Sequence, residues 1–353
     1  MSKEAKYHHL IPQTYLRNWC YQNDSIYTIP IENLEEVETK NIANNFGLNN
    51  YHTIKAGMPS CTEDDLLKIF APLKNIDVYH EARLLTSLKE QNEFYYFFDE
   101  WVLKYKNGEA VNRKEKNKIK AEIEKCKILD IEFLWSLKYE NGWSKLFKKI
   151  QQEVNNEKNN HIESFYKGKL MKFIVSLDWR SFIGNNNVNE VLGFFNETVN
   201  LSDINIPFEE RDIPNDRTYL DWAKRNFLLK KFRDFLNEDG LMYDMAKGYI
   251  KNLTLKFLIA EGDAEFITSD NPSFTYKTKT GLKHIMPVSP SILVSVEKDS
   301  KHSGRYFIEK VNDDVISKIN SIIIMNAQSK VISRKPTIHY DKTMLKAKLL
   351  EFE

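Results

Sequence analysis

The sequence predicts an α+β fold with an N-terminal β-hairpin, a large helical middle and a C-terminal antiparallel sheet. Up to about residue 250 the apolar residues recur mainly with a helical period, and beyond it they alternate with polar residues as in strands. A chain of 353 residues, 42% of them hydrophobic, can bury one elaborate core or two interlocked ones. We expect three regions: a motif segment and hairpin in 1–60 that packs on the C-terminal sheet, a helical region in 61–250 and a sheet region in 251–353.

The N-terminal hairpin is expected from two short segments. Residues 26–31 read Ile-Tyr-Thr-Ile-Pro-Ile, and their β-branched and aromatic side chains are typical of a strand that a proline closes. A second strand is predicted near 37–40. The asparagine- and glycine-rich segment that follows, 41–52, is expected to be a loop.

The helical middle begins at Thr62, which precedes three acidic residues and an apolar helical face, as in a capped helix. The aromatic-rich segment 93–106 and the segment 113–127, in which charges of both signs alternate, are also predicted helices. We interpret segment 113–127 as a solvated helix with ion pairs between side chains four residues apart. A local contact with nucleic acid is the alternative. A further long helix is expected over 215–236.

The last third is predicted to be rich in strands because short β-branched and aromatic runs alternate with glycine, proline and asparagine turns. We expect strands at 254–260, 265–268, 284–287, 292–296 and 306–308, a helix at 313–326, a last strand near 330–333, and a charged tail.

Composition narrows the classes of function. The chain has 51 basic and 50 acidic residues, so no net field draws it to a long nucleic acid or an anionic membrane. Its three cysteines have no CxxC spacing, which indicates a reducing cytoplasm and argues against a cysteine zinc site. The first residues are polar and no apolar run approaches 18 residues, so we expect a cytoplasmic protein with no membrane partner.

The first stretch with chemical potential is His8-His9, which lies just before Pro12 and a predicted helix over 13–19. Proline suits the first turn of a helix, so both imidazoles are expected at a helix N-terminus, where unpaired N–H groups favour a bound anion. The alternative is that the two histidines are surface residues at a flexible terminus.

The second stretch is 266–272, in which a strand delivers Ser269, Asp270 and Asn271 onto a turn that Pro272 ends. The carboxylate and amide are expected at the sheet edge. They could belong to a binding site, or they could form an Asx-turn that fixes the direction of the chain.

Arg180 closes a predicted helix and lies on its apolar side. A buried guanidinium needs an anionic partner, because an unpaired buried charge is costly. Two interpretations stay open: an internal ion pair with Asp178 or another carboxylate, and a contact with a substrate phosphate.

Together these segments resemble a known family. The pattern His8-His9-x-x-Pro12-x-x-Tyr15-Leu16, the Arg180 that ends a helix, the strand-borne segment 267–272 and the later Met-Pro-x-Ser-Pro at 286–290 are similar to the uncharacterised, largely bacterial family catalogued as domain of unknown function 4238. The resemblance implies one shared centre and a place in phage-defence or mobile-element neighbourhoods. With Ser269, we call the following the motif residues: His8, His9, Gln13, Tyr15, Arg180, Ser269, Asp270 and Asn271.

Residues 8–12 are also similar to the first strand of His-Asn-His nucleases, in which such a pair supplies a metal ligand and a general base. The likeness ends there, because those nucleases continue with a hairpin, whereas Gln13 begins a predicted helix here. Residues 90–160 also extend beyond the family pattern.

Two functions follow from the motif residues. The first is a metal-dependent hydrolase of phosphodiesters, a nuclease or nucleotide hydrolase, with His9 as general base, His8 and Asp270 holding Mg²⁺, Mn²⁺ or Zn²⁺, and Arg180 on the phosphate of a nucleic acid or nucleotide. Gln13, Tyr15, Ser269 and Asn271 would support the site or contact the substrate. The alternative is a non-catalytic module for a small anionic ligand or a protein partner, in which these residues form a structural network between the N-terminal segment and the C-terminal sheet.

Overall fold

The computed structural model describes residues 7–156, 160–181, 192–193, 196–278, 281–298 and 304–350. The chain divides into two compact units, each assembled from segments that are distant in sequence. Unit 1 comprises Met1–Asn49, Trp135–Glu197 and Asp234–Glu353, and unit 2 comprises Asn50–Leu134 and Thr198–Arg233. The division falls within two helices, α5 (Asp130–Trp135) and α9 (Tyr219–Leu236).

Unit 1 is built on a six-stranded sheet, which confirms the α+β class. Its strand order is β11-β12-β13-β9-β14-β8, with bounds Phe274–Thr278, Gly281–Ser289, Ile292–Lys298, Leu253–Ala260, Arg305–Val311 and His161–Glu163. Most neighbours are antiparallel, but β14 runs parallel to β9, with Ile308 opposite Phe257. The expected antiparallel sheet is therefore mixed. The side-chain alternation of a strand is the same for either partner direction, so the sequence did not indicate this pair.

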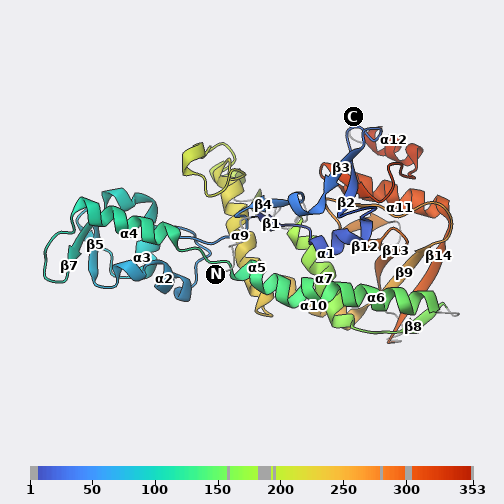
Figure 1. Ribbon diagram of the computed structural model, residues 1–353, viewed down its shortest axis with the longest axis horizontal. Helices are drawn as coiled ribbons and strands as arrows, with labels where there is room; N and C mark the ends of the chain where they lie inside the picture. The colour runs from blue at the N-terminus through green and yellow to red at the C-terminus, as the bar shows by residue number, and fades with distance from the viewer. Residues whose placement is uncertain are drawn as a thin grey trace. The chain divides into compact units, whose positions relative to one another are not determined.

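The two faces of this sheet pack on different helices. In β13, Val294 and Val296 point into a core with α6 (Asn141–Asn156) and α7 (Lys167–Arg180), whereas Leu293 points into a core with α11 (Asp313–Asn326). This alternation follows from the two-residue period of a strand. Figure 1 shows α11 on one side of these strands and α6 on the other.

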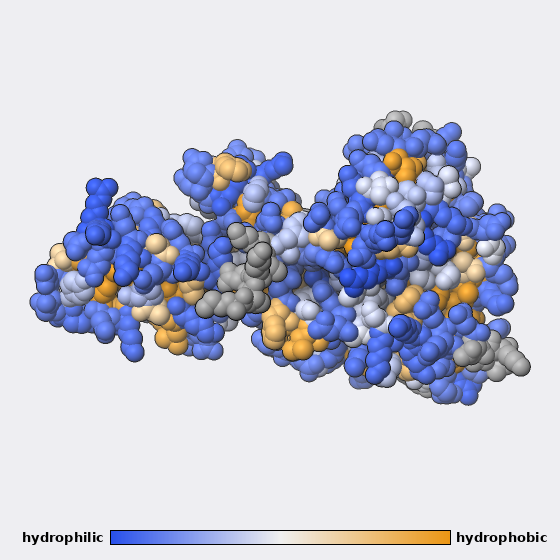
Figure 2. Space-filling model, viewed as in Figure 1, coloured by the Kyte–Doolittle hydropathy of each residue, from blue (hydrophilic) through white to orange (hydrophobic). Residues whose placement is uncertain are grey.

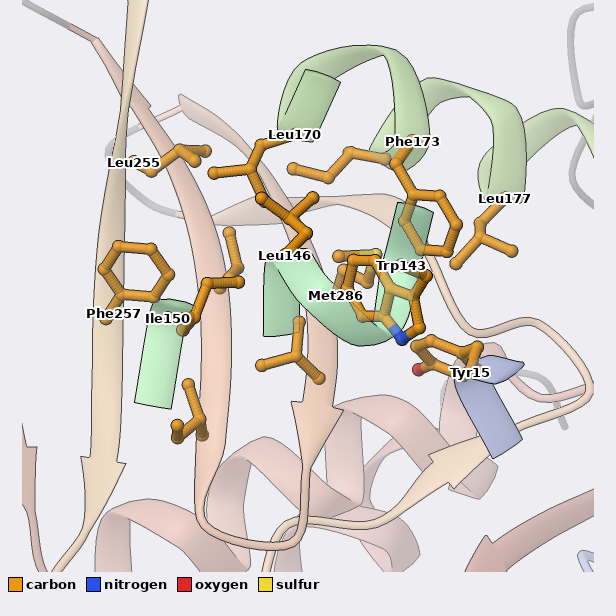
Figure 3. Close-up of a cluster of buried hydrophobic side chains, with 14 of the residues drawn as sticks. Tyr15, Trp143, Leu146, Ile150, Leu170, Phe173, Leu177, Leu255, Phe257 and Met286 are labelled. Atoms are coloured by element: carbon orange, nitrogen blue, oxygen red, sulfur yellow. The ribbon is translucent and has the colours of Figure 1, made fainter. Parts of the chain in front are cut away.

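Aromatic side chains dominate the core beside α6 and α7. The rings of Trp143 and Phe173 stack with their centroids 4.0 Å apart, and the Tyr15 ring lies 6.1 Å from Trp143 (Figure 3). Tyr15 belongs to α1 (Gln13–Leu16), which continues as the 3₁₀ turn Arg17–Trp19. Tyr15, Leu16 and Trp19, which form the apolar side of the predicted helix, are fully buried.

Strands from both ends of the chain share a second sheet in unit 1. Its order is β10-β15-β2-β3, with bounds Thr268–Ser269, Lys330–Ser333, Ser25–Pro30 and Glu38–Asn41. Val331 of β15 lies opposite Ile29 on one side and Ser269 on the other. A separate pair joins β1 (Tyr7–His9) to β4 (Gly47–Asn49).

Unit 2 contains α2 (Glu63–Ile69), α3 (Leu88–Glu93), α4 (Arg113–Lys125) and a three-stranded sheet β6-β5-β7. Its strands are Arg83–Leu84, Ile76–His80 and Val102–Tyr105. Thr62 and Asp65 form the capping box that begins α2. Three strands of this unit and β8 thus lie inside the region that was expected to be helical.

The prediction of a helix over 93–106 is wrong. After α3 the chain forms 3₁₀ turns over Tyr95–Glu100 and then enters β7. Trp101 is buried and its ring lies 4.8 Å from that of Phe98, while Val102–Tyr105 pairs with β5. A short run rich in aromatic residues fits a helix or a strand, and the available partner strand decides between them.

The remaining helices are α10 (Gly240–Asn252), which packs on α7, and α12 (Lys342–Leu350), which lies in the expected charged tail. Within the described residues, none of the helices has the length and apolar character needed to cross a membrane. Hydrophilic residues cover most of the face shown in Figure 2.

We predict that Trp143→Ala lowers the free energy of unfolding by about 3–5 kcal/mol, because it removes a buried ring and leaves a cavity against Phe173. Urea denaturation followed by circular dichroism measures the change. Leu282→Ala is the control, since Leu282 is 74% exposed in the same unit and its loss should shift stability by no more than about 0.5 kcal/mol. Equal effects of the two substitutions would contradict the packing described for this core.

Candidate functional site

His8 and His9 lie in β1, where they pair with Leu48 and Gly47 of β4. His8 is buried and His9 is half-buried. A Cβ atom at Gly47 would collide with the carbonyl oxygen of His8, so glycine is required for this close pairing. The imidazoles are therefore strand side chains, and Pro12 is the residue that caps α1.

Nε2 of His9 has two polar neighbours and can bond only one of them at a time, because a ring nitrogen either donates or accepts a hydrogen bond. This nitrogen lies 3.2 Å from the carbonyl oxygen of Ala43 and 3.0 Å from Nε2 of Gln13. The Gln13 side chain reaches back from the first position of α1, four residues after His9.

Arg180 is buried at the end of α7 and has an intrachain anionic partner. Its Nη1 donates to Oε1 of Glu140 at 2.6 Å, and its Nη2 donates to the carbonyl oxygen of His9. The guanidinium carbon lies 4.7 Å from the centre of the Trp135 ring. The predicted internal ion pair exists, but its carboxylate is Glu140, which precedes α6, and not Asp178.

The Asp270 carboxylate closes the turn that leads into β15. Its Oδ1 accepts a hydrogen bond from the backbone N–H of Gln328 at 2.8 Å. Its Oδ2 accepts from the backbone N–H and the hydroxyl of Ser329, at 2.8 and 2.7 Å, and from the N–H of Lys330 at 3.2 Å. Both oxygens are thus bonded to donors of the chain itself.

A shallow concavity of about 170 Å³ lies beside Asp270, and Leu10 and Ile11 also line it. The structure thereby brings the turn of Asp270 next to the segment that follows His9. In the described ranges, no group of three histidine, cysteine or acidic side chains close enough to share an ion includes Asp270 or His9.

Tyr15, Ser269 and Asn271 belong to a buried hydrogen-bond network. The Tyr15 hydroxyl donates to the Pro287 carbonyl at 2.6 Å and lies 2.9 Å from the Thr268 hydroxyl. Burial raises the pKa of Tyr15 well above its ordinary value, so the phenol stays protonated.

Asn271 connects three elements of unit 1. Its Oδ1 accepts from the Ser181 hydroxyl at 2.8 Å, and its Nδ2 donates to the Asn326 carbonyl at 2.9 Å. The Ser269 hydroxyl donates to the Asn271 carbonyl and accepts from the Asn271 N–H. The ends of α7 and α11 are thereby fastened to β10.

The sequence interpretation missed a buried Ser–His pair. Nε2 of His284 lies 2.8 Å from Oγ of Ser273, and Nδ1 lies 3.0 Å from the Thr275 hydroxyl. Because the Ser273 hydroxyl donates to the Ile174 carbonyl, it accepts from the imidazole. Ser273 is fully buried, and burial lowers the pKa of His284 to about 3. The pair therefore packs β12 against α7 with a neutral histidine and does not resemble a nucleophile open to substrate.

Unit 2 has buried ion pairs that the sequence did not indicate. Arg225 of α9 bonds Asp216 and Asp212, and Lys55 lies 2.8 Å from Asp212. Both aspartates and the arginine are almost fully buried. Asp216 and Asp212 precede Arg225 by 9 and 13 residues, which is not the spacing of a helical ion pair. No local sequence pattern could therefore reveal these ion pairs.

A cavity of about 440 Å³ lies beside these ion pairs, and all of its lining residues belong to unit 2. Its size is within the range of small-molecule sites. It was not predicted, because its lining comes from five separate stretches of the chain.

The family model described as "Protein of unknown function (DUF4238)" matches residues 7–337. The match includes every motif residue. Searches of curated proteins and of solved structures found no match.

We predict that His284 makes the protein less stable in acid. The unfolded chain binds a proton at the ordinary histidine pKa of 6.5, whereas folded His284 binds one only near pH 3. Its contribution is thus complete above pH 6.5 and declines as the pH falls from 6.5 towards 3, by up to about 1.4 kcal/mol per pH unit.

Urea denaturation of wild type and His284→Gln between pH 7 and 4 measures this effect, because the difference between their slopes isolates the one histidine. His339→Gln, at an exposed position of the same unit, should keep the wild-type slope. A His284→Gln variant with an unchanged slope would show that His284 titrates normally.

Proposed function

We propose that this chain, which belongs to the family Protein of unknown function (DUF4238), is a non-catalytic module that binds a small anionic ligand. In this proposal the motif residues stabilise unit 1 and the ligand binds elsewhere. The observation that carries the proposal is that the side chains of Arg180, Asp270 and Asn271 bond to other parts of unit 1.

Arg180 supports this proposal most directly. A phosphate that bound its guanidinium would have to displace Glu140 and the His9 carbonyl. Breaking a buried ion pair typically costs about 3–5 kcal/mol, because the remaining charge is left unpaired. The energy of a new phosphate contact would largely be cancelled by this loss.

The bonding of Asp270 also supports a non-catalytic role for the motif residues. A divalent ion needs free lone pairs on the carboxylate, whereas four N–H and O–H donors already point at the two oxygens of Asp270. The positive ends of those donor dipoles also oppose a cation. The arrangement is typical of a carboxylate that closes a turn.

Metal-dependent hydrolysis is the second candidate, favoured by the partial exposure of His9. In that case His9 acts as general base, and His8 and Asp270 hold Mg²⁺, Mn²⁺ or Zn²⁺. Arg180 contacts the phosphate of a nucleotide or nucleic acid. Such an enzyme would be a nuclease or nucleotide hydrolase, with phage defence as its proposed setting. The two candidates differ in their response to metal.

We predict that Asp270→Asn lowers the free energy of unfolding by about 1–3 kcal/mol, equally with and without metal. An amide has only one acceptor oxygen, so its NH₂ group would face donors of Ser329 and Lys330. Thermal unfolding of chelator-treated protein, alone and with each of the three ions, measures this. Asp263→Asn is the control, because Asp263 is exposed in the same unit.

A metal-dependent hydrolase would respond to metal differently in the same thermal unfolding experiment. A metal ion that binds the folded state would raise the melting temperature of wild type, and Asp270→Asn would abolish that rise. Cleavage of bis(para-nitrophenyl) phosphate by wild type, lost in His9→Ala, would establish the second candidate and reject the first.

We predict that at least one small anion raises the melting temperature of the wild-type protein in a concentration-dependent manner, because it binds only the folded state. A thermal-shift series with citrate, inorganic phosphate and nucleoside monophosphates tests this, with sodium chloride at matched ionic strength as the control. If none of these anions shifts the melting temperature, the binding function is rejected.

A further inference from the structure

We infer that the 440 Å³ cavity of unit 2 binds an aromatic anion with the chemistry of a nucleoside monophosphate. The inference rests on the proposed function, since it gives the binding module a site and a ligand class. The motif residues play no part in it, because all of them belong to unit 1.

One wall of the cavity is a loop that the fold holds in place. The N–H of Gly57 donates to Oδ1 of Asn92 at 2.8 Å, and Nδ2 of Asn92 donates to the Met58 carbonyl at 3.0 Å. Gly57 has φ +86°, and a Cβ atom there would lie 2.7 Å from the Tyr96 ring. The loop is thus shaped before any ligand binds, as is usual for small-molecule sites.

The buried ion pairs fix the opposite wall. Asp212 accepts from Nε1 of Trp222 at 2.9 Å and from Nη2 of Arg225 at 3.0 Å, and Lys55 lies against its other oxygen. Asp212 and Arg225 both line the cavity. This charge network therefore positions Lys55 at the cavity.

Two residues that line the cavity carry buried hydroxyls with no hydrogen-bond partner among the described residues. Thr53 is 5% exposed, and neither its Oγ1 nor the Oη of Tyr95 has a hydrogen-bond partner among the residues that the structure describes. Buried polar atoms are nearly always bonded, so such atoms at a cavity indicate a missing polar partner. Burial also raises the pKa of Tyr95 above its ordinary value, which keeps its hydroxyl a donor.

Aromatic rings provide a surface for a planar base. Tyr95, Tyr96 and Phe98 all line the cavity, and the rings of Tyr95 and Phe98 lie 6.0 Å apart. Tyr96 is 53% exposed, which leaves much of its ring open. Nucleobases stack on such rings with little dependence on base identity.

The charges at the cavity suit a single phosphate. Lys127 is exposed and forms no ion pair within the described part of the chain, whereas Lys120 is held by Asp99. Lys55 also lines the cavity and is 38% exposed, but Asp212 already pairs with it. Glu124 and Glu209 also line the cavity, where they can accept from ribose hydroxyls and would repel a more highly charged polyphosphate.

Isothermal titration calorimetry of the full chain with AMP, GMP, CMP and UMP tests the inference, with inorganic phosphate and adenosine as partial ligands. Thr53→Val and Tyr95→Phe should each weaken binding by about 3- to 10-fold, the loss of one hydrogen bond. Their melting temperatures should be unchanged or higher, because each substitution removes a buried hydroxyl that has no partner. Lys127→Gln should weaken binding and reduce its dependence on salt.

Matched controls lie elsewhere in the chain. Thr28 is also buried with an unpartnered hydroxyl but belongs to unit 1, so Thr28→Val should leave binding unchanged. Lys125→Gln changes a neighbouring lysine that does not line the cavity. Both controls should bind like wild type.

The outcomes separate this inference from the proposed function. If wild type binds a monophosphate and all three cavity variants bind it equally well, the ligand lies elsewhere and this inference fails while the binding function stands. Thr53→Val or Tyr95→Phe variants that melt earlier than wild type would show that the hydroxyls serve the fold, which also rejects the site. If wild type binds none of the anions, both proposals fail.

Discussion

The buried guanidinium of Arg180 constrains much of unit 1, because a charge removed from water must meet an anion and further acceptors. Glu140 supplies the anion, the His9 carbonyl supplies an acceptor, and the face of Trp135 covers the group. The end of α7, the residue before α6 and the N-terminal strand are therefore held at one point. The aromatic core of Tyr15, with Trp143 and Phe173, packs between the same elements.

The motif residues and the unit 2 cavity differ in how their hydroxyls are satisfied. Thr268 of β10 lies at hydrogen-bond distance from the Tyr15 hydroxyl, and the Ser181 hydroxyl bonds Asn271. Thr53, which lines the cavity, is also buried, yet its hydroxyl has no partner in the described ranges. A satisfied network stabilises and specifies a fold, whereas an unsatisfied atom at a cavity is available for recognition. This contrast favours a ligand site away from the motif residues.

Elements with strong local signals could be predicted closely. The helix Asp313–Asn326 and the strand Lys330–Ser333 have the bounds expected from the sequence, because acidic first-turn residues, apolar periodicity and a short β-branched run are local properties. The segment 93–106 failed because its aromatic residues suit a helix or a strand equally. Its pairing with β5 joins residues that are 23 to 29 positions apart.

The sequence by itself determined the α+β class, the apolar side of the first helix and the family of the chain. It also indicated that Arg180 needs an anion and that Asp270 lies on a turn. Only the tertiary structure decided that the anion is Glu140, that the turn of Asp270 is completed by residues 328–330, and that β14 runs parallel to β9. The physical reason is that the burial and the charge of a residue determine which kind of partner it needs. The identity of a distant partner depends on how the whole chain packs, and it leaves no periodic pattern in the sequence.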